Sequence, residues 1–167
     1  DGILKSIRGV IMELSLKPDY EKSKERYDAF WDCEIIDRPP VSIILPKDDP
    51  KPALQKEYES FEDRWLDIEF RAGAIDIDLQ NKIYYADGLP IVFPNMGPEI
   101  FSAWCGCGYK FGDTTAWSEP CIMDWERDET NSVFDPKHPL FKAMVEFTKV
   151  LIERGKGKFI ETFVNST

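Results

Sequence analysis

Short apolar runs alternate with longer segments of helical periodicity along this chain. The apolar runs fall at residues 41–45 (VSIIL), 89–93 (LPIVF) and 158–164 (KFIETFV). They are rich in β-branched and aromatic residues, and the almost wholly apolar 41–45 run predicts a strand buried on both faces. Helices are expected at residues 18–33, 52–85 and 99–105, and from Pro139 onward. This order predicts an α/β fold in which βαβ units form a parallel sheet.

Aromatic residues at helical spacing define the first two long helices. The first begins near Pro18, which an initial helical turn tolerates, and the DRPP sequence at 37–40 ends it. The apolar seam of the second consists of Leu54, Tyr58, Phe61, Trp65 and Ile68. These positions follow one another at intervals of four, three, four and three residues, the period of an amphipathic helix. Gly73 is the point at which this helix is expected to bend or divide.

The last helix and the segment before it differ in regularity. The apolar face of the helix consists of Phe141, Met144, Val145, Thr148, Leu151 and Ile152. Gly155 and Gly157 are expected to end it. Residues 106–137 are instead rich in Gly, Asp, Trp and Pro, which predicts an irregular excursion with one hairpin. A loop of that length is typical of the border of a functional site.

Composition narrows the class of protein. The chain has 167 residues, of which 43% are hydrophobic and 13% aromatic, enough for one domain with an apolar core. It carries 21 Lys and Arg against 31 Asp and Glu, a net charge of −10 at pH 7. A chain this acidic repels phosphate backbones and anionic lipids, so nucleic acid and membranes are not expected partners. No apolar run approaches the length that spans a bilayer.

The cysteines and the two ends of the chain carry separate information. Four cysteines in a chain of this size do not make a disulfide framework and indicate reduced thiols in a cytoplasmic protein. The chain starts at Asp1 and stops within the 158–167 run, so both ends are expected to be cut from a longer protein. The predicted organisation is a lead-in over residues 1–17 and a truncated domain over residues 18–167.

Three stretches resemble one known superfamily. They are RYDAFWDCEIIDRPPVSI at 26–43, GLPIVFPNMGPEIFSAWCGCGYKFGDTTAWSEPCIMDWE at 88–126, and FDPKHPLFKAMVEF at 134–147. They resemble the N-terminal third to half of uroporphyrinogen decarboxylase-like proteins, over roughly residues 12–167. That superfamily includes the heme-pathway decarboxylase and methylcobamide:coenzyme M methyltransferases. The tracts IIDRPPV and VFPNMGPEIFSAWCG resemble an uncharacterised branch of it rather than the decarboxylase proper.

The resemblance implies the N-terminal portion of a (β/α)8 TIM-type barrel, with about three parallel strands and flanking helices. Residues 41–45, 89–93 and 158–164 would be the first three barrel strands. In such barrels the reacting residues stand at the C-terminal ends of the strands. These ends carry Lys47, Asn95 and the Asn165–Ser166 pair in this sequence.

Asn95 stands where the resemblance places the catalytic aspartate of the decarboxylase. An anion there can bond pyrrole N–H groups and stabilise a protonated ring, whereas Asn95 brings hydrogen bonds but no charge. The decarboxylase also has two arginines after its first strand for substrate carboxylates, where this chain has Lys47 and two aspartates. Asn95 is therefore the catalytic candidate and Lys47 a substrate-binding candidate. The alternative for Asn95, between Pro94 and Met96-Gly97, is a residue that only forms a turn.

Aromatic residues of the long excursion are further substrate-binding candidates. Trp104, Tyr109 and Trp117, with Phe111 and Trp125, would wall an apolar pocket for a planar ring system. The alternative is a satellite core that holds the loop in place. Acidic residues of the same excursion are expected to be solvated: Asp113, Glu119, Asp124 and Glu126.

Metal-binding residues are not expected within this chain. Cys105 and Cys107 form a C-x-C pair, but two clean C-x₂-C knuckles are lacking, and Cys33 lies on a predicted helix among aromatics. The interpretation is small, buried, unreactive thiols. His138, at a helix start, is interpreted as a capping or exposed residue rather than a catalytic one. No cofactor is assigned to this chain, although the resemblance implies zinc and a corrinoid for a full-length methyltransferase.

Three functions remain open. The favoured hypothesis is the N-terminal part of a corrinoid-linked methyltransferase that acts on a small molecule or a corrinoid protein. The second is uroporphyrinogen III decarboxylase of heme biosynthesis, a carboxy-lyase that needs no cofactor. The third is a non-catalytic module that self-associates as a homo-oligomer, because three strands of a barrel leave an open edge. Under the first two hypotheses the chain alone is expected to be inactive.

Overall fold

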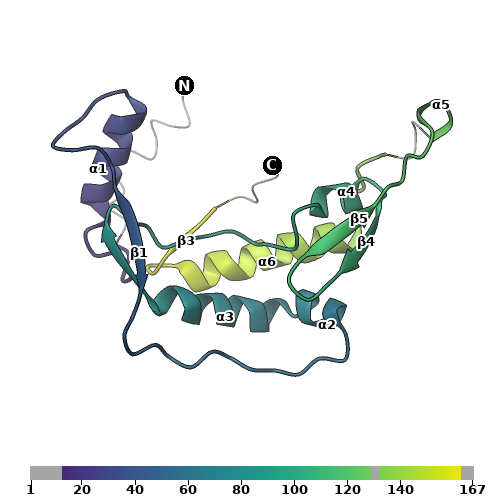
Figure 1. The fold of residues 1–167 in the computed structure, drawn as a ribbon, viewed down its shortest axis with the longest axis horizontal. Helices are drawn as coiled ribbons and strands as arrows, with labels where there is room; N and C mark the ends of the chain where they lie inside the picture. Colours follow the sequence, from purple (N-terminus) through teal and green to yellow (C-terminus); the bar gives the residue numbers. More distant parts are fainter. Residues whose placement is uncertain (1–12, 129–131, 163–167) are drawn as a thin grey trace.

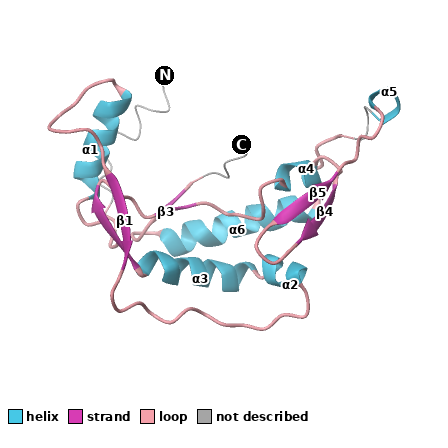
Figure 2. Cartoon of the chain, viewed as in Figure 1, coloured by secondary structure: helices cyan, strands magenta, loops and turns pink. Residues whose placement is uncertain are grey.

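The computed structural model describes residues 13–128 and 132–162 as a mixed α/β chain. Two helices, α3 (Ile68–Gln80) and α6 (Pro139–Gly155), lie side by side at its centre (Figure 1). One end carries α1 (Tyr20–Trp31) and a two-stranded ribbon. The other end carries the short helices α2 (Phe61–Leu66) and α4 (Ile100–Trp104) and a second ribbon (Figure 2). The described residues form three two-stranded sheets and no closed barrel.

The apolar core lies where α3, α4 and α6 meet. Its buried members are Ala72, Met96, Ile100, Ala103, Met144, Phe147 and Leu151. Met144 and Leu151 come from the apolar face predicted for the last helix, whereas Val145 and Ile152 of that face are exposed. Phe147, which was not assigned to the face, is fully buried. The side chain of His138 caps α6, with Nδ1 accepting from the Leu140 N–H at 3.3 Å, and Pro139 occupies the first turn. The prediction of this helix and the capping interpretation of His138 are both confirmed.

The described residues contain one parallel pair of strands, and α6 lies between the two strands in the chain. Strand β3 (Ile91–Val92) pairs in parallel with β6 (Ile160–Glu161), and Ile91 faces Ile160. Helix α6 ends at Gly155, and the ring of Phe159 packs against this glycine. A Cβ added at Gly155 would lie 2.8 Å from that ring. The chain then turns back beside β3. Strands within 89–93 and 158–164 were predicted correctly, although both are shorter than expected and residues 163–164 lie outside the described part.

The 41–45 run was wrongly predicted to be a buried parallel strand. Strand β1 (Ser42–Pro46) pairs antiparallel with β2 (Lys82–Ala86), and all five β1 residues are exposed. Ile43, Ile44 and Leu45 are each about 45% exposed because no described helix covers the ribbon. An apolar run of this length does not by itself identify its partner strand.

The helix predicted over residues 52–85 was wrong at both ends. Residues 51–58 have no regular structure, so Leu54 and Tyr58 precede the helices instead of lying on their seam. Residues 82–86 (KIYYA) form β2, in which Tyr84 is buried and Tyr85 exposed, as expected of a strand with period two. Gly73 does not divide α3.

The break in that segment comes at Asp67, between α2 and α3. Its Oδ1 accepts from the Phe70 N–H at 3.1 Å and caps α3, while Oδ2 binds Lys56 and Tyr58. Ser60 caps α2 in the same way through Asp63 N–H at 3.1 Å. These polar caps set the helix boundaries where apolar periodicity alone gave no signal.

The excursion over residues 106–137 contains the expected hairpin. Strands β4 (Gly108–Phe111) and β5 (Ala116–Glu119) pair antiparallel. Helix α4 confirms the prediction for 99–105, and α5 (Trp125–Asp128) is a single turn. Within the described ranges no helix is long and apolar enough to cross a bilayer.

Candidate functional site

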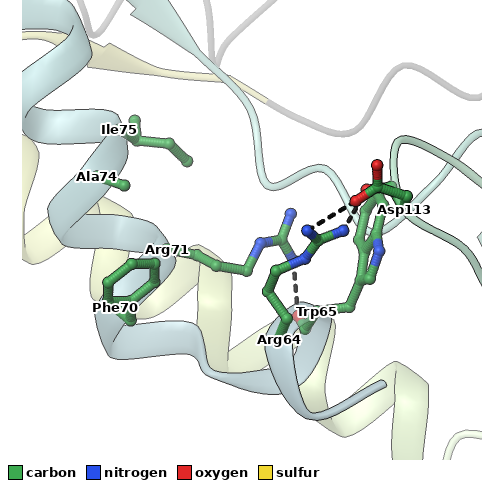
Figure 3. A pocket seen from close by; sticks show the side chains of 7 residues that line it. All are labelled: Arg64, Trp65, Phe70, Arg71, Ala74, Ile75 and Asp113. Carbon is green, nitrogen blue, oxygen red and sulfur yellow. Dashed lines mark hydrogen bonds and ion pairs between the residues drawn. The ribbon is translucent and has the colours of Figure 1, made fainter. Parts of the chain in front are cut away.

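A hollow of about 290 Å³ lies between α2, α3 and the turn that joins β4 to β5 (Figure 3). Its lining consists of Arg64, Trp65, Phe70, Arg71, Ala74, Ile75 and Asp113. Four of these side chains are apolar or aromatic, and the other three are charged. A mostly apolar hollow with a few convergent charged groups is the usual form of a small-molecule site.

Arg71 is the most unusual residue of the hollow. Its guanidinium carbon lies 4.8 Å from the ring centroids of both Trp65 and Phe147. Nη1 donates to the Trp65 carbonyl at 2.8 Å, and Nη2 donates to the carbonyl of Asn95. Burial lowers the pKa of Arg71 to about 10, and the nearby charge of Arg64 acts in the same direction. The guanidinium nevertheless stays protonated at neutral pH.

Arg64 connects α2 to the hairpin turn. Its Nη1 lies 2.9 Å from Asp113 Oδ1, and its Nη2 donates to the Asp113 carbonyl. Beside it, Trp65 Nε1 donates to the Gly112 carbonyl at 2.8 Å. Three contacts thus hold the turn over the hollow. The hairpin is one wall of the site, as expected for the long excursion.

Asn95 follows β3 and does not line the hollow, but its backbone carbonyl accepts from Arg71, which does. Its Oδ1 accepts from the Gly97 N–H at 2.9 Å, and Gly97 adopts a φ of 104°, so the side chain shapes a turn. Tyr109 donates its hydroxyl to the Met96 carbonyl at 3.0 Å and closes the same turn. Burial, with the charge of Glu99, raises the pKa of Tyr109 to about 12. Asn95 and Tyr109 therefore both stabilise the turn that follows β3.

The other predicted site residues do not line this hollow. Lys47 lies at the exposed end of the β1–β2 ribbon, where its N–H bonds the Asn81 carbonyl at 2.8 Å. Trp104 packs edge-on against Phe101 and Phe141, in a separate aromatic group. Trp117 is 55% exposed. Lys47, Trp104 and Trp117 are therefore not part of the hollow.

The aromatic residues of the excursion act mainly as a satellite core. Tyr109 packs edge-on against Phe111, and Phe111 stacks on Trp65 with centroids 5.7 Å apart. The chain of rings links the hairpin to α2. Trp65, which was predicted as a seam residue and not as a site residue, lines the hollow, whereas Trp104 and Trp117 do not. Its indole N–H bond to a loop carbonyl could not be anticipated from spacing.

Cys105, Cys107 and Cys121 flank the hairpin, whereas Cys33 lies elsewhere. Cys107 Sγ and Cys121 Sγ lie 2.9 Å apart. The contact with Cys107 raises the pKa of the Cys121 thiol, and burial and Cys105 add to it. Over residues 13–128 and 132–162, no group of three or more His, Cys, Asp or Glu side chains could hold a metal ion. Cys33 is exposed just beyond α1, with a φ of 60°, so its predicted place among helix aromatics was wrong.

The acidic residues of the excursion are mostly surface groups in local contacts. Asp113 pairs with Arg64, and Glu119 pairs with Lys110 at 2.5 Å. Asp124 accepts from the Glu126 N–H at 3.0 Å. None of these carboxylates stands unpaired in the hollow, which agrees with the expectation of solvated loop charges.

Asp87 is a functional-looking residue that the sequence did not single out. Its carboxylate is fully buried and accepts from Arg26 Nη1 at 3.0 Å, from Arg38 Nη1 and from the Val41 N–H at 2.9 Å. Burial alone would raise its pKa, but these bonds outweigh burial and lower it to about 2. Tyr27 also donates to its carbonyl at 3.0 Å. These contacts tie α1 and the segment that follows it to the end of β2, so the role is structural.

Comparison with models of protein families, with curated proteins and with solved structures found no match. The candidate site is therefore defined by its geometry alone. That geometry consists of a hollow with two arginines, walled by a hairpin and linked through Arg71 to the turn after β3.

Proposed function

We propose that this chain forms the N-terminal part of a uroporphyrinogen decarboxylase-like enzyme that transfers a corrinoid-linked methyl group. The observation that carries the proposal is the parallel pairing of β3 with β6, with α6 between them in the chain. A strand, a helix and a neighbouring parallel strand make the repeating unit of a TIM-type barrel. Asn95 follows β3, where such barrels place reacting residues, and its carbonyl accepts from Arg71 of the hollow.

The charges around Asn95 favour methyl transfer over decarboxylation. A decarboxylase of this superfamily needs an anion to stabilise a protonated pyrrole ring. Asn95 is neutral, and its Oδ1 is engaged by Gly97. Among the described residues that line the hollow, the one acid, Asp113, is paired with Arg64. An amide and two arginines are better suited to orient an anionic substrate than to stabilise a cationic ring.

The resemblance implies zinc and a corrinoid for the methyltransferase. The described residues do not fit zinc, because they supply no group of three ligands. The zinc ligands would belong to a later part of the barrel. The role proposed for this chain is to bind and orient the substrate beside Asn95.

The test uses the protein expressed from its complete reading frame, with methylcobalamin and a small thiol as substrates. We expect thiol-dependent demethylation of the corrinoid, followed by its absorbance, and at least a tenfold slower reaction in Asn95→Ala. Asn81→Ala is the matched control, because Asn81 binds Lys51 on the ribbon side of α3. Formation of coproporphyrinogen from uroporphyrinogen would instead establish the decarboxylase. Turnover of neither substrate would refute both enzyme functions.

One observation favours the third function, self-association. The apolar residues Ile43, Ile44 and Leu45 are about half exposed on a two-stranded ribbon that no described helix covers. Exposed apolar strands are common sites of association. Size-exclusion chromatography of the 167-residue chain separates the cases, since a homo-oligomer elutes earlier than a monomer.

A further inference from the structure

Arg71 is a cation that has no counter-ion among the described residues. Within the part of the chain that the structure describes, its contacts are two backbone carbonyls and two aromatic rings. No described carboxylate forms an ion pair with it, in contrast to Arg26, Arg38, Arg64, Arg127 and Arg154. Arg71 is half-buried, and a charge partly withdrawn from water without a partner of opposite sign is unfavourable. A bound anion would supply the missing partner.

The guanidinium also keeps hydrogen-bonding capacity for a ligand. A guanidinium has five N–H donors in a planar fork. Two carbonyls engage Nη1 and Nη2, which leaves donors uncommitted among the described contacts. Stacking on Trp65 and Phe147 holds the plane of the fork in one orientation. Such a fixed fork matches the two oxygens of a carboxylate.

A second arginine strengthens the positive potential of the hollow. Figure 3 shows the guanidinium groups of Arg64 and Arg71 beside each other, and Asp113 reaches only Arg64. The three charged lining residues therefore sum to one positive charge, although the whole chain has a net charge of −10. Two nearby cations repel each other, and an anion between them relieves that repulsion.

The remaining lining determines what else the ligand contains. Trp65, Phe70, Ala74 and Ile75 present apolar surface, and the volume of about 290 Å³ accommodates a body the size of one ring. One surplus positive charge suits a singly charged anion better than a phosphate dianion, which usually recruits several donors. Apolar walls beside a planar cation thus favour an organic acid with an apolar body.

We propose that the hollow between α2, α3 and the hairpin turn binds a small organic carboxylate, whose carboxylate contacts Arg71 and whose apolar body packs on Trp65, Phe70 and Ile75. A small organic carboxylate is then the substrate class of the proposed enzyme. That assignment rests on the proposed function, whereas binding in the hollow does not. Binding requires no turnover, so it can be tested when catalysis fails.

The experiment is calorimetric titration of the 167-residue chain with benzoate at low salt. Benzamide has the same shape without the charge, and we expect it to bind at least tenfold more weakly. Arg71→Met keeps the apolar stem and should also lose at least tenfold in affinity. Arg154→Met is the matched control, because Arg154 forms an exposed pair with Glu69 outside the hollow, and it should bind benzoate as the wild type does.

The opposing outcomes are equally specific. Equal affinities for benzoate and benzamide, or unchanged benzoate affinity in Arg71→Met, would overturn the proposal. Inorganic phosphate binding more tightly than benzoate would replace the carboxylate with a phosphate ligand. If Arg71→Met does not fold, the benzoate and benzamide titrations of the wild type decide the charge requirement. Arg71→Lys, which keeps the charge but not the fork, should then bind with intermediate affinity.

Discussion

The centre of the molecule and the β1–β2 ribbon are held together by different forces. Around α3 and α6, apolar side chains such as Phe147 and Leu151 are fully removed from water. In strand β1 the apolar residues stay exposed, while Lys17 and Asp87 are charged groups buried beside the ribbon. Lys17 Nζ reaches the carbonyls of Ala86 at 2.6 Å and Tyr84 at 3.3 Å.

The comparison shows how a small domain can attach a surface ribbon without covering it. Apolar burial is proportional to the area withdrawn from water and tolerates many partners. Buried charges instead require specific partners at specific distances. The core should therefore be sensitive to side-chain volume and the ribbon to charge.

The largest expected effect is in the core. Phe147→Ala removes a fully buried ring and leaves a cavity, which should lower the free energy of unfolding by about 4 kcal/mol. Urea denaturation followed by circular dichroism measures it. Phe30→Ala is the matched control, since Phe30 is 51% exposed and should change stability by less than about 1 kcal/mol. Equal losses in the two variants would contradict the contrast between the two regions.

The ribbon should respond strongly to loss of one charge. Asp87→Asn keeps the shape but leaves Arg26 and Arg38 without their buried partner, which should cost about 3 kcal/mol. The wild-type pKa of about 2 lies below the ordinary value of 3.8. The stabilisation by Asp87 is therefore full above pH 4 and is lost as the pH falls toward 2. Urea titrations between pH 2 and 6 should show this loss in the wild type and not in Asp87→Asn.

A smaller effect is expected at the other buried charge of the ribbon. Lys17→Met fills the same space but removes the side-chain donor to the Tyr84 carbonyl, whereas the Ala86 carbonyl keeps the Ser23 hydroxyl at 3.3 Å. An unsatisfied buried acceptor costs about 1–2 kcal/mol. Lys24→Met serves as the control, because Lys24 forms only an exposed pair with Asp28. Hydrogen exchange of the β2 amides should increase in Lys17→Met alone.

The smallest effect should come from the apolar surface of the ribbon. Ile44→Thr keeps a β-branched residue in β1 and removes apolar area that is already 46% exposed. We expect a change in the free energy of unfolding below about 0.5 kcal/mol. A loss comparable to that of Phe147→Ala would mean that another surface covers this strand in solution. Comparing dilute with concentrated protein distinguishes self-association from an intramolecular cover.

Local signals predicted several elements correctly. Helix α6 has a continuous apolar face and Pro139 in its first turn, and α4 and the β4–β5 hairpin are bounded by Gly and Pro. The segment 52–85 failed because its apolar spacing matched a helix, whereas caps at Ser60 and Asp67 divided it. Strand β2 was missed because its partner β1 lies about 40 residues earlier in the chain. Pairing over such a distance leaves no local pattern.

The candidate site was predicted only in part. Asn95 was singled out by its place after a strand, and its side chain forms part of the turn that follows β3. Arg71 was overlooked because an arginine in a helix is usually solvated. Its isolation depends on Asn95 and Phe147, which reach it from distant parts of the chain.

The sequence by itself determined the order of the main helices, the acidic surface and the hairpin, because periodicity, capping and turn residues act over a few positions. Only the tertiary structure decided which strands pair and which charges are buried. It placed two arginines around the carboxylate of Asp87, and among the described residues it placed no carboxylate in an ion pair with Arg71. Burial and charge pairing are properties of contacts between distant residues, so they arise only when the chain has folded.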